Sequence, residues 1–115
     1  MKVLLDHCVP RSFGRLLPGH VVRTTALMKW DRLKNGDLLA AAAKEFDVML
    51  TVDANLRSQQ DLGNFPLPVV AFVANSNAIE DLAPLAPETQ SLLNSKLQNR
   101  VYIVGPYRVP RPGTR

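Results

Sequence analysis

Three aspartates occupy positions at which a small protein could assemble a metal site. Asp6 and Asp53 each end an apolar run that is typical of a buried strand, and Asp37 opens a predicted helix. If the two strands are parallel neighbours, their carboxylates meet at the sheet edge where α/β proteins bind ligands. Grouped carboxylates repel one another unless a cation or shared protons lie between them. We therefore predict a site for Mg²⁺ or Mn²⁺, with Asp6, Asp37 and Asp53 as metal ligands and catalytic residues.

The same aspartates have a structural interpretation that the sequence leaves open. Aspartate is common at strand ends and helix starts because its side chain bonds nearby backbone groups. In the first turn of a helix an acid also contributes ~0.3–1 kcal/mol through the helix dipole, which would account for Asp37. Asp61, eight residues after Asp53, is a further candidate acid for the site.

The elements that would position these residues alternate along the chain. Apolar and β-branched runs predict strands at residues 2–6, 20–25, 47–53, 66–74 and 101–104. Helices are predicted at residues 10–17, 37–46, 78–82 and 87–98, with a helical turn or short helix at residues 26–34 and 55–61. This alternation is typical of an α/β domain, and we expect a three-layer α/β/α arrangement around a mostly parallel central sheet.

Length and composition limit the classes of protein to consider. The 115 residues, 46% hydrophobic and 21% charged, fit one globular domain. No apolar run approaches the ~20 residues of a membrane span, and the single cysteine, Cys8, excludes an internal disulfide framework. We expect a cytoplasmic protein that contacts no membrane, with a domain at residues 1–104 and a basic, proline-rich tail at residues 105–115.

Positive charge is the second feature of the composition. The net charge of +4 permits RNA or DNA as a partner without requiring one. No acid follows Glu88, whereas five basic residues do, so the excess charge is concentrated in the last quarter of the chain. Arg11 and Arg15 lie on the predicted helix after Asp6, where they either flank the site or form an exposed helix face.

Several other classes of site are excluded by missing residues. The chain has no Gly-rich phosphate loop, and its cysteine and histidines lack the spacing of a zinc site. A phosphate-transferring aspartate of the haloacid dehalogenase kind would want a second aspartate where Cys8 stands. Residues 69–74 lead into Asn75, so the lysine of a receiver domain is absent as well.

Three short blocks carry a resemblance to a known family. They are Leu4-Leu5-Asp6 followed by Pro10, then Lys34-Asn35-Gly36-Asp37-Leu38-Leu39, then Leu50-Thr51-Val52-Asp53-Ala54-Asn55-Leu56 with Gln59-Gln60. Together they resemble the small, uncharacterised PIN-like proteins of toxin type, over about the first two-thirds of the chain.

The resemblance implies both a fold and a function. PIN domains are α/β folds on a parallel sheet, many are Mg²⁺- or Mn²⁺-dependent ribonucleases, and many are toxins held by a small antitoxin protein. It implies that Asp6, Asp37 and Asp53 fall on the acidic metal-site positions and that Asn55 and Arg57 lie just beyond the third acid. An RNA substrate, an antitoxin partner and a homodimer are the interactions that it suggests.

One departure from the family pattern concerns the first block. Relatives usually have Asp-Glu-Asn after the leucines, whereas here His7 and Cys8 follow Asp6. If the glutamate contributes to the site, this chain lacks one negative charge there, since a neutral imidazole is a poor Mg²⁺ ligand. Two hypotheses stay open: a metal-dependent ribonuclease with His7 as an accessory residue, or a degenerate PIN-like module that binds a partner or nucleic acid without cutting it.

Overall fold

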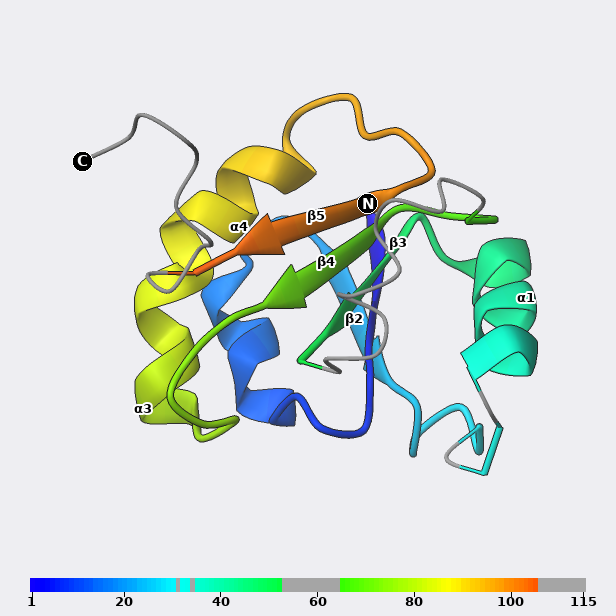
Figure 1. The fold of residues 1–115 in the computed structure, drawn as a ribbon, viewed down its shortest axis with the longest axis horizontal. Helices are drawn as coiled ribbons and strands as arrows, with labels where there is room; N and C mark the ends of the chain where they lie inside the picture. The colour runs from blue at the N-terminus through cyan, green and yellow to red at the C-terminus, as the bar shows by residue number, and fades with distance from the viewer. Residues whose placement is uncertain (31, 34, 53–64, 106–115) are drawn as a thin grey trace, which may run out of the picture.

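The computed structural model describes residues 1–30, 32–33, 35–52 and 65–105, and these build an α/β fold. Its five strands are β1 (Lys2–Leu5), β2 (Val21–Thr24), β3 (Val48–Thr51), β4 (Val69–Phe72) and β5 (Val101–Val104). They form one sheet in the order β2-β1-β3-β4-β5, and every neighbouring pair is parallel (Figure 1). The prediction of an α/β domain on a parallel sheet is confirmed.

Helical segments connect the strands. They are η1 (Arg11–Leu16), α1 (Asn35–Glu45), α3 (Ile79–Leu82), η3 (Ala83–Leu85) and α4 (Ala86–Leu93). α1 and α3 lie close to where the sequence predicts helices, and prolines stand in the first turns of η3 and α4, where a missing N–H costs nothing.

The structure refines two helix predictions and shortens a third. The helix predicted at residues 10–17 is a 3₁₀ helix, η1, in which a Cβ on Gly14 would come within 3.0 Å of the Val22 side chain. Within the described part of residues 26–34, where a helical turn or short helix is predicted, residues 26–29 form hydrogen-bonded turns, and the left-handed φ of 62° at Lys29 prevents a continuous helix. The helix predicted at residues 87–98 ends at Leu93, since the Ser95 hydroxyl donates to the Leu92 carbonyl at 2.7 Å.

Buried side chains lie on both faces of the sheet because alternate strand residues point in opposite directions. On one face Val3 and Leu5 belong to a cluster that the helices η1, α3 and α4 supply with apolar residues. On the other face Leu4 packs with α1. Figure 1 shows α1 on one side of the sheet, away from α3 and α4.

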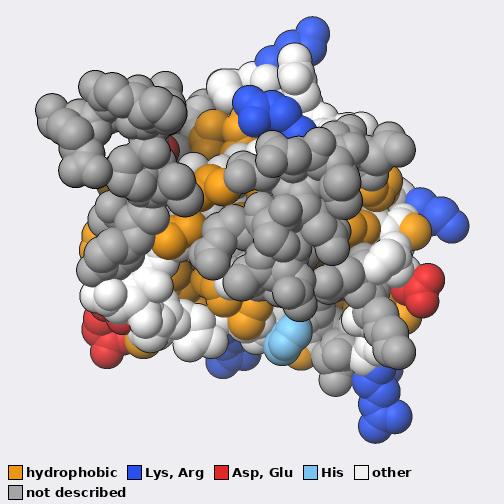
Figure 2. All heavy atoms as spheres, viewed as in Figure 1, with side chains coloured by type: hydrophobic (Ala, Val, Ile, Leu, Met, Phe, Trp, Pro, Cys, Tyr) orange, Lys and Arg blue, Asp and Glu red, His pale blue; other side chains and the backbone are white. Residues whose placement is uncertain are grey.

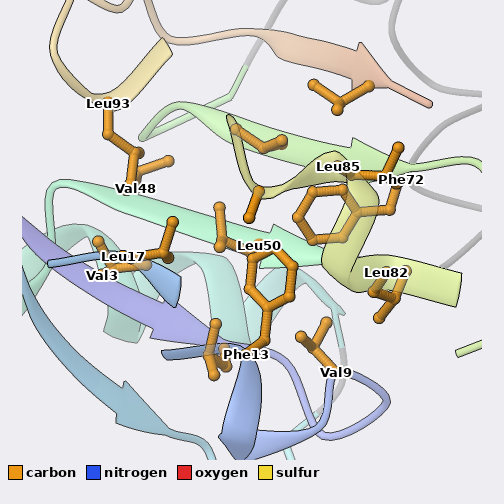
Figure 3. Close-up of a cluster of buried hydrophobic side chains, with 14 residues drawn as sticks. Val3, Val9, Phe13, Leu17, Val48, Leu50, Phe72, Leu82, Leu85 and Leu93 are labelled. Carbon is orange, nitrogen blue, oxygen red and sulfur yellow. The ribbon is translucent and has the colours of Figure 1, made fainter. Parts of the chain in front are cut away.

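The larger cluster fixes the chain just after β1. Phe13 of η1 lies against Phe72 of β4, with ring centroids 5.2 Å apart and planes tilted by 56°. Val9, Leu50 and Leu82 surround this pair (Figure 3). Val9 and Phe13 therefore tie the segment that follows Asp6 to the core.

The strand order reverses between β1 and β3. From β1 the chain moves outward to β2 and then returns past β1 to β3, after which β4 and β5 continue away from it. In open parallel sheets, ligands bind outside the carboxyl ends of the strands at such a reversal. The residues that follow β1 and β3 are therefore the candidates for a ligand-binding site.

Among the described residues, no helix has the length and apolar character needed to cross a membrane.

Gly105 allows the ends of β4 and β5 to approach closely. It has a φ of 153°, and a Cβ at this position would overlap the carbonyl oxygen of Val73. We predict that Gly105→Ala lowers the free energy of unfolding by about 1–3 kcal/mol, measured by urea denaturation. Gly36→Ala is the control: it lies in α1 with no described atom within 4 Å of the added Cβ, and should be neutral or stabilising by up to ~1 kcal/mol. Equal losses would contradict the close approach.

Candidate functional site

Asp6 lies directly beyond β1, at the reversal of the strand order. Its backbone N–H donates to the Leu50 carbonyl of β3 at 2.9 Å, so it continues the pairing of the two central strands. The residue is only 2% exposed. The predicted location of Asp6 at the carboxyl edge of the sheet is therefore correct, and its side chain is more deeply buried than an ordinary strand-end acid.

The Asp6 carboxylate is held through both of its oxygens. The Thr51 hydroxyl of β3 donates to Oδ2 at 2.8 Å, and the His7 backbone N–H donates to Oδ1 at 2.8 Å. The His7 ring nitrogen Nδ1 lies 3.0 Å from the same Oδ1 and donates to it whenever it carries a proton. Because a buried carboxylate must be hydrogen-bonded, these contacts explain how the fold tolerates it.

The pairing of Asp6 with Thr51 follows from the strand register. Leu4 of β1 and Met49 of β3 are Cα partners, and both contribute to the cluster on the α1 face. Asp6 and Thr51 each follow these partners by two residues. Because side chains alternate between the two faces of a sheet, both return to the α1 face. The threonine at the end of an otherwise apolar strand is the sequence signal that could have revealed this partner.

Cys8 also contacts the carboxylate, but its thiol does not have the properties of a nucleophile. Its Sγ lies 3.8 Å from Asp6 Oδ2 and 3.8 Å from Thr51 Oγ1. Burial, and to a smaller extent the Asp6 carboxylate, raises the pKa of the Cys8 thiol above its ordinary value. Since the thiolate is the reactive form, this site disfavours thiol chemistry.

An open cleft of about 520 Å³ lies beside Asp6, between the ends of β1 and β2. His7, Arg11 and Thr25 line it together with Asp6. Thr25 is 1% exposed, and its hydroxyl has no hydrogen-bond partner among the described residues. A buried hydroxyl without a partner at the wall of a cleft is available to a bound ligand or water.

Of the other predicted site residues that the structure describes, His7 contacts Asp6, whereas Asp37 does not. Asp37 lies in the first turn of α1 with an exposed side chain, and no described hydrogen bond or ion pair joins it to Asp6. This position suits the helix-dipole interpretation of Asp37. The calls on Asp53, Asn55, Arg57 and Asp61 lie outside the described residues.

The described residues alone supply too few ligands for a metal site. Within the ranges given above, no group of three or more His, Cys, Asp or Glu side chains could hold a metal ion. Asp6 itself can contribute: Thr51 and the His7 backbone use two of its roughly four lone pairs, and the third contact comes from a His7 side chain that is 71% exposed. An exposed ring can turn away at little cost, which would open Oδ1 to a hard cation.

Two buried threonines, Thr51 at the Asp6 carboxylate and Thr25 at the cleft, form a matched pair for testing the Asp6 contacts. Thr51→Val removes the hydroxyl that donates to Asp6, so we expect the free energy of unfolding to fall by about 1–3 kcal/mol in urea denaturation at neutral pH. Thr25→Val makes the same chemical change at a hydroxyl without a described partner and should be neutral or slightly stabilising. A loss of similar size in both variants would show that the Thr51 contact does not support the carboxylate.

No protein-family model, no curated protein and no solved structure matches this chain. Its function is therefore inferred from the residues and geometry of the site.

Proposed function

We propose that the chain is a divalent-metal-dependent ribonuclease of the PIN-like type, with the three-layer arrangement of that fold, and that it acts in the cytoplasm as the toxin of a toxin–antitoxin pair. One observation carries the proposal: a buried carboxylate, Asp6, lies beside an open cleft at the strand-order reversal of an all-parallel sheet. Carboxylates at that place are suited to holding a cation against a phosphate ester.

The proposed metal site combines Asp6 with acids taken from the sequence prediction. Asp53 follows Thr51 by two residues, and Thr51 contacts Asp6, which supports Asp53 as the second ligand. Asp37, exposed in the first turn of α1, would complete or orient the metal site through water. Asn55, Arg57 and Asp61 remain accessory candidates on the strength of the sequence. Mg²⁺ or Mn²⁺ fits this all-oxygen set.

In the proposed site, one residue of the chain orients the Asp6 carboxylate and another binds the phosphate. A bound divalent cation would supply Lewis-acid polarisation of the phosphodiester and lower the pKa of an attacking water. Thr51 fixes the Asp6 carboxylate through Oδ2, leaving Oδ1 on the side of the exposed His7 ring. Arg11 lines the same cleft, where its guanidinium can hold a phosphate through two parallel hydrogen bonds.

The decisive measurement is cleavage of a mixed single-stranded RNA pool with Mn²⁺ and with Mg²⁺. We expect metal-dependent cutting by the wild type and a loss of about 100-fold or more in Asp6→Asn and in Asp53→Asn, because each removes a charged ligand. Asp47→Asn is the control with the same charge change: Asp47 accepts from the Lys2 N–H at the opposite edge of the sheet. Cutting that survives in both site variants, with circular dichroism showing folded protein, would reject the proposal.

A second function is favoured by the same contacts that hold Asp6. Its oxygens are already satisfied by Thr51 and His7, which is the state expected of a carboxylate with a structural role. In that case the PIN-like fold serves as a module that binds a protein partner or nucleic acid without cutting it. His7 separates the two functions, since its ring competes with a cation for Oδ1.

We predict that His7→Ala binds Mn²⁺ at least as tightly as the wild type, measured as a saturable rise of the melting temperature with metal concentration. Removal of the exposed ring frees Oδ1 without disturbing the Thr51 contact. Asp6→Asn should abolish the rise. Absence of a rise in the wild type and in His7→Ala would favour the binding module, and tenfold weaker binding in His7→Ala would make His7 a ligand instead of a competitor.

A further inference from the structure

A second groove, which we name the arginine groove, runs beside the Asp6 cleft between η1 and β2. It encloses about 420 Å³ and is lined by Arg11 and Arg15 of η1, by Arg23 of β2, and by His20 just before β2. No aspartate or glutamate lines it among the described residues. A concave surface with several cations and no anion concentrates positive potential and attracts anionic ligands.

The arginines of this groove are available to a ligand. None of them takes part in the contact between His7 and Asp6, which is an ion pair only when the imidazole is protonated. Arg23 donates one hydrogen bond from Nη1 to the Val22 carbonyl at 3.0 Å, which leaves the rest of its donors unused by that contact. Guanidinium groups in this state match phosphate oxygens in geometry and charge.

The arginine groove leads directly to the Asp6 cleft. Arg11, Thr24 and Leu27 line both hollows, so the two share a wall at the carboxyl ends of β1 and β2. The floor is apolar, formed by Leu5 and Val22, with Gly14 permitting η1 to lie close to Val22. Leu27, 63% exposed at the junction, offers an apolar surface on which a base can rest.

The clustering of cations in this groove differs from their arrangement on the face seen in Figure 2. On the face seen in Figure 2, the Lys and Arg side chains of the described residues lie around the outline, separated by surface of other kinds. In the arginine groove, three arginines from two elements line one hollow.

We propose that the arginine groove binds the sugar-phosphate backbone of single-stranded RNA and guides the strand to Asp6. This inference rests on the proposed nuclease function and names its substrate path. A hollow of about 420 Å³ between one helix and one strand admits a single strand and is too small for a duplex. The strand's phosphates lie on Arg15 and Arg23, and Arg11 holds the phosphate nearest to Asp6.

The test measures binding separately from cleavage. Fluorescence anisotropy of a labelled single-stranded RNA is recorded in EDTA across a range of salt concentrations, with the full chain carrying Arg15→Gln and Arg23→Gln. Binding should weaken by about tenfold or more at low salt, and the slope of log K against log salt should shrink by about 1.4, or 0.7 for each lost phosphate contact. The control, Lys44→Gln with Lys96→Gln, removes the same charge at exposed residues away from the groove and should leave both quantities nearly unchanged.

A second double variant separates loss of charge from loss of fold. Arg15→Lys with Arg23→Lys keeps both charges, so it should recover most of the affinity and the full salt slope.

Equal weakening in the groove and control variants would overturn the proposal, because the affinity for RNA would then depend on net charge alone. Groove-dependent binding without metal-dependent cutting would keep the arginine groove and reject the nuclease, whereas cutting with groove-independent binding would do the reverse. Equal affinity for duplex RNA would also overturn the single-strand path.

Discussion

The burial of one carboxylate constrains the whole carboxyl edge of the sheet. Asp6 is taken out of water at the end of a strand whose preceding three residues are fully buried and apolar. An isolated charge there would be very unfavourable, so its hydrogen bonds have to be supplied by the fold. Thr51 supplies one from the neighbouring strand, and the chain's own turn into His7 supplies another. The register of β1 with β3 and the path of the following segment are both required for these contacts.

The same segment is fixed from the opposite side by apolar packing. Val9 and Phe13 enter the core a few residues after Asp6, and the Asn77 side chain donates to the Cys8 carbonyl at 2.9 Å. The turn that positions His7 and Arg11 therefore cannot move independently of the core. Site geometry and core packing are coupled, because Val9 and Phe13, which follow the turn, belong to the core cluster.

Local pattern was sufficient to predict some features and could not predict others. The strands were predictable because runs such as residues 48–52 are apolar on both faces, and Asp6 was predictable at the edge because it ends such a run. Thr51 is a polar residue at the end of an apolar strand, which is a signal in the sequence, but its pairing with Asp6 also depends on the strand register across 45 residues. The pattern could not show that Asp37 stays exposed or that η1 is 3₁₀, because both depend on how the helices pack in the folded chain. The arginine groove likewise arises from the packing of η1 against β2, so spacing alone left Arg11 and Arg15 undecided.

The long separation between Asp6 and Thr51 also has a consequence for the order of folding. β1 precedes both of its neighbours in the sheet along the chain, and β3 is the more distant of them in sequence. Parallel strands cannot pair through a short hairpin, and closing a long loop slows such pairing. Until β3 docks, the Asp6 carboxylate lacks the Thr51 hydroxyl and one wall of its burial site. A growing chain therefore carries this acid as an ordinary hydrated group, and its special environment arises only once synthesis has passed residue 51.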